Sequence, residues 1–246
     1  ELVQTAKKRG FNALALTDHG NMYGAMEFYQ ACLKEEIKPI VGMEAYLAPG
    51  SRKDKDPNDR FYHLVLLALN RTGYQNLMKL ASLANLEGFY YKPRLDKELL
   101  RQYHEGLVAS SACFGGEIPW ILHKENNYEK AKKVALEYQE IFGVGNFYLE
   151  LMDIPALEGQ NEVNNQLLRI AKETGIPAIV TRDVHYLNSE DAEAQDVLTC
   201  IRDGKTIDDT NRQTMSCIDV SICTGAEIDF LNLLPKTFQT IKRMTR

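Results

Sequence analysis

Short apolar runs alternate with amphipathic stretches along most of the chain. Six runs are brief and almost continuously apolar, as is typical of strands buried on both faces. They predict strands near residues 14, 43, 65, 109, 149 and 179. Helical periodicity predicts intervening helices over residues 2–10, 26–33, 72–84, 128–142 and 160–173. The alternation indicates an α/β fold with a parallel sheet covered by helices.

Two architectures fit this alternation, an open doubly wound sheet and a closed barrel. Polar side chains lie within or just beyond successive strands. Loops at the C-terminal rim of a barrel converge on one site, whereas an open sheet brings polar loops together mainly at one switch point. The polar pattern therefore favours the barrel without excluding the open sheet.

Composition narrows the classes of protein. No run among the 246 residues approaches the roughly 20 apolar residues of a membrane helix, so we expect no membrane partner. A formal charge of -5 means that any DNA contact must be local. The five cysteines are an odd number without a CxxC pair, which favours a reducing compartment. We predict a cytoplasmic protein.

Residues with metal-binding donors follow the predicted strands. Imidazole, carboxylate and thiolate groups are the donors that zinc and its first-row neighbours prefer. In the segment 183–185, the one-residue spacing should point Asp and His to the same side of an extended backbone. A cluster of two or more ions can activate water for phosphoester cleavage. The candidates are His19, Glu44, His63, Cys113, Asp183 and His185.

Each candidate also has a simpler structural interpretation. His63 could be a hydrogen-bonded core histidine, and Cys113 a small buried hydrophobe. Asp18 could cap the following helix, and Glu44 could pair with a lysine. The coincidence favours the metal site, because three of the five histidines fall at strand-linked positions.

Three other segments carry separate predictions. Tyr91, Lys92 and Arg94 combine aromatic faces with cations, which could stack on bases and contact phosphates. The residues by themselves favour the alternative, a surface loop that packs its tyrosines. Residues 49–60 predict a solvated loop between strands. Residues 224–227 resemble a capping box that opens a final helix.

Several stretches resemble one known family. They are LTDHGNMYGA at 16–25, KPIVGME at 38–44, GYQNLMKL at 73–80, GFYYKPR at 88–94, SAC at 111–113 and DVHYL at 183–187. They look like the PHP (polymerase and histidinol phosphatase) domain of bacterial replicative DNA polymerase III alpha subunits. The resemblance runs from about residue 2 to 211, and the blocks at 73 and 88 are particular to the polymerase branch.

The resemblance implies a PHP-type, seven-stranded (β/α) TIM-like barrel with up to three divalent ions, zinc or manganese, at its rim. The implied ligands are the six candidates above, with Asp18 and Asp183 as catalytic residues. The family opens with a strand that carries an HxH pair, which this sequence lacks. We therefore expect a fragment with six of seven strands, a barrel domain over 1–211, and an extension over 212–246 that leads towards the polymerase region.

The resemblance also implies a function. The parent protein would be a DNA polymerase, and this domain would hydrolyse phosphoesters, with 3′–5′ exonuclease proofreading as the specific expectation. Implied partners are DNA, the remaining polymerase domains, a proofreading subunit and the sliding clamp. Two alternatives are a non-catalytic interaction module and a stand-alone small-molecule phosphatase. The isolated fragment is expected to be inactive.

Overall fold

The computed structural model describes residues 1–154, 156–212, 214 and 220–222. All six predicted strands are confirmed there, and two short strands were not predicted. The strands are β1 (Ala13–Leu16), β2 (Lys38–Leu47), β3 (Tyr62–Ala68), β4 (Phe89–Tyr90), β5 (Lys92–Leu95), β6 (Leu107–Ser110), β7 (Phe147–Met152) and β8 (Ala178–Thr181). The predicted capping box at 224–227 lies outside the described residues.

The predicted helices are also confirmed, with small shifts at their ends. The helices are α1 (Leu2–Lys8), α2 (Ala25–Lys34), α3 (Arg71–Leu86), α4 (Lys97–Tyr103), α5 (Glu117–Trp120), α6 (Tyr128–Phe142), α7 (Gln160–Thr174) and α8 (Ala192–Asp203). A π-helical turn, η1 (Ile121–Glu125), follows α5, and a 3₁₀ turn, η2 (Ser189–Asp191), precedes α8. Within the described part of the chain, none of the helices combines the length and apolar character needed to cross a bilayer.

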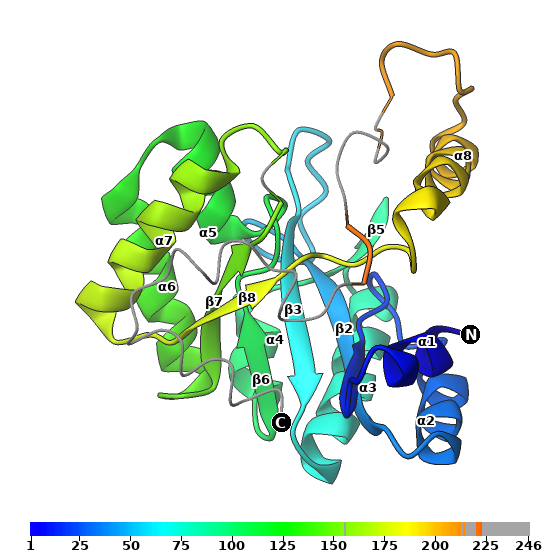
Figure 1. Ribbon diagram of the computed structural model, residues 1–246. Helices are drawn as coiled ribbons and strands as arrows, with labels where there is room; N and C mark the ends of the chain where they lie inside the picture. The colour runs from blue at the N-terminus through cyan, green and yellow to red at the C-terminus, as the bar shows by residue number, and fades with distance from the viewer. Residues whose placement is uncertain (155, 213, 215–219, 223–246) are drawn as a thin grey trace.

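The strands form one curled sheet in the order β4-β5-β2-β3-β6-β7-β8, and β1 pairs with β2. Helices α5, α6 and α7 flank the β7–β8 end, and α1 and α2 flank the other end (Figure 1). Among the described residues β1 and β8 do not pair with each other, so the curl stays open. The architecture is the α/β, barrel-type fold expected from the sequence.

The prediction of a parallel sheet is wrong at β3 and at the short strand β4, which pairs antiparallel with β5. β3 runs antiparallel to both β2 and β6, whereas the pairs β1–β2, β6–β7 and β7–β8 are parallel. A parallel neighbour of β2 would need a long crossover, usually a helix, before the chain could return. The connection over residues 48–61 contains no helix that could carry the chain back along the sheet, and β3 pairs in the opposite direction.

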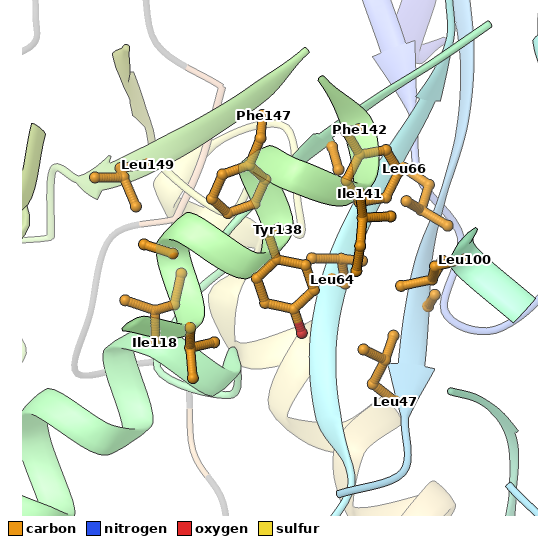
Figure 2. Packing of buried hydrophobic residues seen from close by; sticks show 14 of the residues in the cluster. Leu47, Leu64, Leu66, Leu100, Ile118, Tyr138, Ile141, Phe142, Phe147 and Leu149 are labelled. Carbon is orange, nitrogen blue, oxygen red and sulfur yellow. The ribbon is translucent and has the colours of Figure 1, made fainter. Parts of the chain in front are cut away.

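The main core lies between the sheet and the helices that cover it. On α6, Asn127 caps the first turn by accepting a hydrogen bond from the Lys130 amide, and the buried positions recur at helical spacing. Tyr138 of this helix stacks on Phe147 of β7, with ring centroids 5.2 Å apart. Figure 2 shows the Tyr138 ring beside Leu64 of β3, and Phe147 belongs to the same buried cluster.

The sequence predicted a solvated loop between β2 and β3. The structure corrects this prediction, because part of the loop is buried. Arg52 within it is only 6% exposed. Its Nη1 lies 2.9 Å from the Asp96 carboxylate and its Nη2 lies 2.6 Å from the Glu87 carboxylate. Asp96 in turn caps α4 by accepting a hydrogen bond from the Leu99 amide. The buried ion pair therefore fastens the loop to α4.

Candidate metal centre

The predicted ligands gather at one rim of the curled sheet. β1, β2, β6, β7 and β8 all run in the same direction, so their C-terminal ends share this rim. Because β3 runs the opposite way, its first residues lie beside those ends. His63, the second residue of β3, pairs with Tyr46 near the end of β2. The reversal of β3 thus brings an early strand residue to the rim.

His19 is aligned with Glu44 by backbone hydrogen bonds that extend the β1–β2 ladder. The Glu44 amide donates to the Asp18 carbonyl at 3.1 Å, and the Gly20 amide donates to the Glu44 carbonyl at 2.9 Å. These bonds form an isolated parallel bridge between His19 and Glu44. The loop after β1 therefore holds the His19 side chain next to the middle of β2.

Glu44 lies between two imidazoles. Its Oε1 is 2.6 Å from His63 Nδ1, and its Oε2 is 3.9 Å from His19 Nδ1. One ligand atom from each of these three residues lies within 4.8 Å of the others. Each carboxylate oxygen therefore faces a different nitrogen donor, an arrangement in which a carboxylate can serve more than one cation.

Cys113 adds a sulfur donor from the turn after β6. Its Sγ lies 3.7 Å from His63 Nδ1. Gly115, two residues later, is required here because a Cβ at that position would come within 2.8 Å of the His63 ring. Burial, followed by the nearby Asp183 and Glu44 charges, raises the pKa of the Cys113 thiol well above its usual range. A cation beside the sulfur would favour the thiolate.

Asp183 and His185 reach the rim through a turn, which corrects the predicted extended geometry. β8 ends at Thr181, and Asp183 has a φ of 49°, in the left-handed region that Asp tolerates better than most residues. His185 Nδ1 lies 2.6 Å from the Asp183 carbonyl oxygen and 3.9 Å from its Oδ1. The His185 ring centroid is 6.2 Å from that of His19. The two side chains therefore meet the other candidates, but by a different backbone path.

Electrostatics favour the cation-binding protonation state of Glu44 and His19 and oppose that of Asp183. Burial opposes the ionisation of Glu44, yet the His63 hydrogen bond and the neighbouring imidazoles hold its pKa below the ordinary value. Burial lowers the pKa of His19, with His63 and His185 acting in the same direction. Burial and the Glu44 charge raise the pKa of Asp183. A divalent cation bound here would favour the ionised carboxylates and the deprotonated His19 ring.

Asp18 also has a structural role, which the sequence offered as an alternative. Its Oδ2 accepts a hydrogen bond from the Gly24 amide at 3.1 Å, immediately before α2. This bond closes the loop that carries His19. The contact supports the capping interpretation, and the predicted catalytic role of Asp18 stays a prediction.

Glu150, a buried acid on β7, was not among the residues predicted from the sequence. Glu150 on β7 is 5% exposed, and hydroxyl groups of Ser110 and Thr181 donate to its carboxylate. Burial, opposed by these hydrogen bonds, raises its pKa from 4.5 to about 7. A lone acid inside an apolar strand, in FYLELM at 147–152, was the available signal.

This shift predicts a pH-dependent stability. The folded state holds the Glu150 proton more tightly than the unfolded state, so the stabilisation is complete below pH 4.5 and is lost as the pH rises to about 7. The loss should reach about 3 kcal/mol. Glu150→Gln cannot ionise, so its free energy of unfolding should rise relative to that of the parent chain across this interval. Urea unfolding with a chelator present measures the difference, and parallel pH profiles would contradict it.

The three predicted nucleic-acid contacts are placed very differently. Tyr91, between β4 and β5, is 74% exposed. Lys92 Nζ lies 5.5 Å from the centre of the Tyr46 ring, which itself stacks on His19. Arg94 is 2% exposed and donates to the backbone carbonyls of Gly88 and Arg52. The prediction for Arg94 is therefore wrong, because its guanidinium is buried in the fold.

The fold and the rim together define an α/β domain with a candidate divalent-cation centre. Residues 1–154 match the family model described as PHP domain. The chain belongs to the PHP domain family. This confirms the family resemblance of the sequence.

The similar curated proteins are replicative polymerase subunits. The chain is 48% identical to DNA polymerase III subunit alpha of Treponema pallidum, over 86% of this chain and 18% of that protein. It is 42% identical to DNA polymerase III subunit alpha of Borreliella burgdorferi, over 99% of this chain and 21% of that protein. The chain thus spans about a fifth of the length of these relatives.

Among solved structures, an amidohydrolase from Chromobacterium violaceum is similar at 13% sequence identity and a TM-score of 0.45. The match covers 74% of this chain and 79% of that one. At this TM-score the similarity supports no conclusion about the fold or the function of this chain.

Proposed function

We propose that this chain is the PHP domain of a bacterial DNA polymerase III alpha subunit and that its rim hydrolyses phosphodiester bonds at the 3′ end of DNA. The observation that carries the proposal is the buried Glu44 carboxylate, with His63 on one oxygen and His19 towards the other. The relatives named above supply the polymerase context.

The donor set fits a group of divalent cations, which we propose to be up to three zinc or manganese ions in the complete domain. Nitrogen, oxygen and sulfur donors converge there. Bound ions would lower the pKa of water and stabilise charge on the phosphoryl oxygens. The proposed ligands are His19, Glu44, His63, Cys113, Asp183 and His185.

Residues of this chain would accept the proton of the attacking water and position the ligands. In the proposed reaction a water oxygen attacks phosphorus, the bond from phosphorus to the 3′ oxygen of the preceding nucleotide breaks, and that oxygen takes up a proton. The products are a nucleoside 5′-monophosphate and a strand shortened by one nucleotide. Asp183 is the proposed acceptor of the water proton, and Asp18 positions His19 by closing its loop.

The surface beside the centre suits a negatively charged strand. Lys92 lies next to Tyr46, and Tyr46 stacks on His19, so a cation stands at the edge of the candidate site. Tyr91 offers an exposed ring one residue away. We propose that these two side chains contact the phosphate backbone and a base of the approaching strand.

The relatives imply further partners in general terms. We propose that the remaining polymerase domains, a proofreading subunit and the sliding clamp assemble with the protein that contains this chain. Residues 1–211 would form the barrel domain and residues 212–246 would lead away from it. Cytoplasmic localisation stays a prediction.

Removal of a 3′-terminal nucleotide by the full-length subunit tests the proposal. With zinc or manganese supplied, Asp183→Asn should lower the rate at least about 100-fold, because the carboxylate would lose its role as proton acceptor. Asp208→Asn, at an exposed position, is the matched control and should keep the rate of the parent protein.

The release of labelled nucleoside 5′-monophosphate gives the rate. Equal rates in the parent protein and Asp183→Asn would refute the site. A parent protein that binds the cations yet releases no nucleotide would instead favour the non-catalytic interaction module.

A further inference from the structure

A cavity of about 510 Å³ adjoins the candidate metal centre. His63, Cys113 and Asp183 line one part of it, so a molecule inside would touch the proposed reaction centre. The volume lies in the range of small-molecule sites, which place a few polar groups in a mostly apolar lining. Apart from Thr214, whose hydroxyl donates to Asp196, two polar side chains in this lining belong to neither the ligand set nor the proposed proton transfer.

The first is Gln160, which begins α7 and is 2% exposed. Asn164 accepts from the Met152 amide through Oδ1 and donates to the Met152 carbonyl through Nδ2, so its orientation is fixed. Gln160 must therefore direct its amide nitrogen towards Asn164 Oδ1, at 3.0 Å. Its own Oε1 is buried and accepts no hydrogen bond from the described residues.

A buried acceptor of this kind costs free energy unless a donor reaches it. The hydrogen bond to Asn164 prevents Gln160 from turning its amide over, so a lining residue of the cavity holds a fixed, unsatisfied acceptor beside that space. Every common nucleobase carries at least one N–H donor.

The second polar group is Arg60, a cation in the same lining. Its guanidinium lies 3.2 Å above the centre of the Trp120 ring, which restricts its position. Arg60 lines the same cavity as Cys113 and Asp183 of the candidate metal centre. A guanidinium held in this way suits a phosphate group.

The rest of the lining is largely apolar and aromatic. Phe61 meets Tyr46 edge to face at 5.0 Å, and Phe114 stacks on His123 with ring centroids 4.6 Å apart. Each ring is thus supported on one side by a second ring. Base stacking on aromatic side chains needs such rigid platforms and tolerates all four bases.

We propose that this cavity binds a nucleoside 5′-phosphate unit, with the phosphate at Arg60, the base against the aromatic wall, and a base N–H donated to Gln160 Oε1. The assignment rests on the proposed function, in which this unit is the 3′-terminal nucleotide of the strand. A free nucleotide offers the same chemistry, so the experiment separates the two sources.

The test measures binding, not hydrolysis, in the full-length subunit by equilibrium dialysis at up to millimolar ligand. The parent protein should bind deoxyadenosine monophosphate saturably. Gln160→Met should weaken this binding about tenfold and leave the binding of deoxyribose 5-phosphate unchanged, because only the base contact is lost. Arg60→Gln should weaken the binding of both ligands about tenfold. Gln102→Met, on the exposed face of α4, is the control and should bind as the parent does.

Several outcomes overturn the proposal. One is the absence of saturable nucleotide binding, and another is unchanged affinity in both Gln160→Met and Arg60→Gln. Melting temperatures accompany the measurement because Gln160 also holds Asn164. If Gln160→Met does not fold, the exposed Arg60 decides the outcome by itself.

A competition experiment separates the two occupants. If a single-stranded oligonucleotide displaces deoxyadenosine monophosphate, the cavity binds the 3′-terminal nucleotide of a strand. If it does not, the cavity binds free nucleotides, and its proposed role at the strand end is contradicted. The two proposals fail separately. Nucleotide binding without any strand hydrolysis overturns the proposed function alone, whereas hydrolysis with unchanged affinities in the variants overturns the cavity assignment alone.

Discussion

Glu44→Gln is expected to lower the affinity of the full-length subunit for zinc or manganese at least about 100-fold, since loss of a residue that only supports a metal ligand already costs 10- to 100-fold. The Glu44 carboxylate faces two imidazoles, with His63 at 2.6 Å and His19 at 3.9 Å. The amide of glutamine keeps the shape but removes the charge and one acceptor oxygen. Metal content after dialysis measures the loss.

The same variant separates loss of metal from loss of fold. Cation binding to the folded state should raise the melting temperature of the parent protein, and this rise should vanish in Glu44→Gln. Without cations the variant should melt close to the parent, because a neutral amide is cheaper to bury than a carboxylate. Glu129→Gln, on the exposed first turn of α6, should bind the metal as the parent does. Undiminished metal content in Glu44→Gln would exclude the proposed centre.

Arg52→Met is expected to lower the free energy of unfolding by about 3–5 kcal/mol, the usual result of removing one partner of a buried ion pair. Arg52 and Asp96 are 6% and 2% exposed, and the guanidinium also contacts Glu87 at 2.6 Å. Methionine fills much of the space but leaves the Asp96 carboxylate buried without its cation. Urea unfolding followed by circular dichroism measures the change.

An exposed ion pair supplies the comparison. Arg101 lies 2.7 Å from Glu137, but its side chain is 52% exposed, so Arg101→Met should cost no more than about 1 kcal/mol. Arg52→Met combined with Asp96→Asn should recover part of the loss, because the second change removes the stranded charge. Equal destabilisation by Arg52→Met and Arg101→Met would show that burial of the pair has no energetic consequence.

Local patterns predicted the elements of this fold well because each depends on neighbours in the chain. The apolar run at 13–16 and the periodicity at 128–142 specify a buried strand and an amphipathic helix wherever they occur. The short strands β4 and β5 were not predicted. Together they contain only six residues, interrupted at Tyr91, which is too few to show a period. The burial of Arg52 and Arg94 was not predicted, because a charged residue in a polar stretch is expected to be exposed unless its partners are known.

The sequence by itself determined which donors this protein carries, that they follow strand-like segments, and which family it belongs to, because residue types and short-range periodicity are properties of the chain. Only the tertiary structure decided that β3 pairs antiparallel with β2 and places His63 beside Glu44. It also decided that Asp183 adopts a left-handed conformation at the rim and that Glu150 and Gln160 are buried. Strand direction and burial depend on contacts between residues far apart in the chain, and no local pattern encodes those contacts.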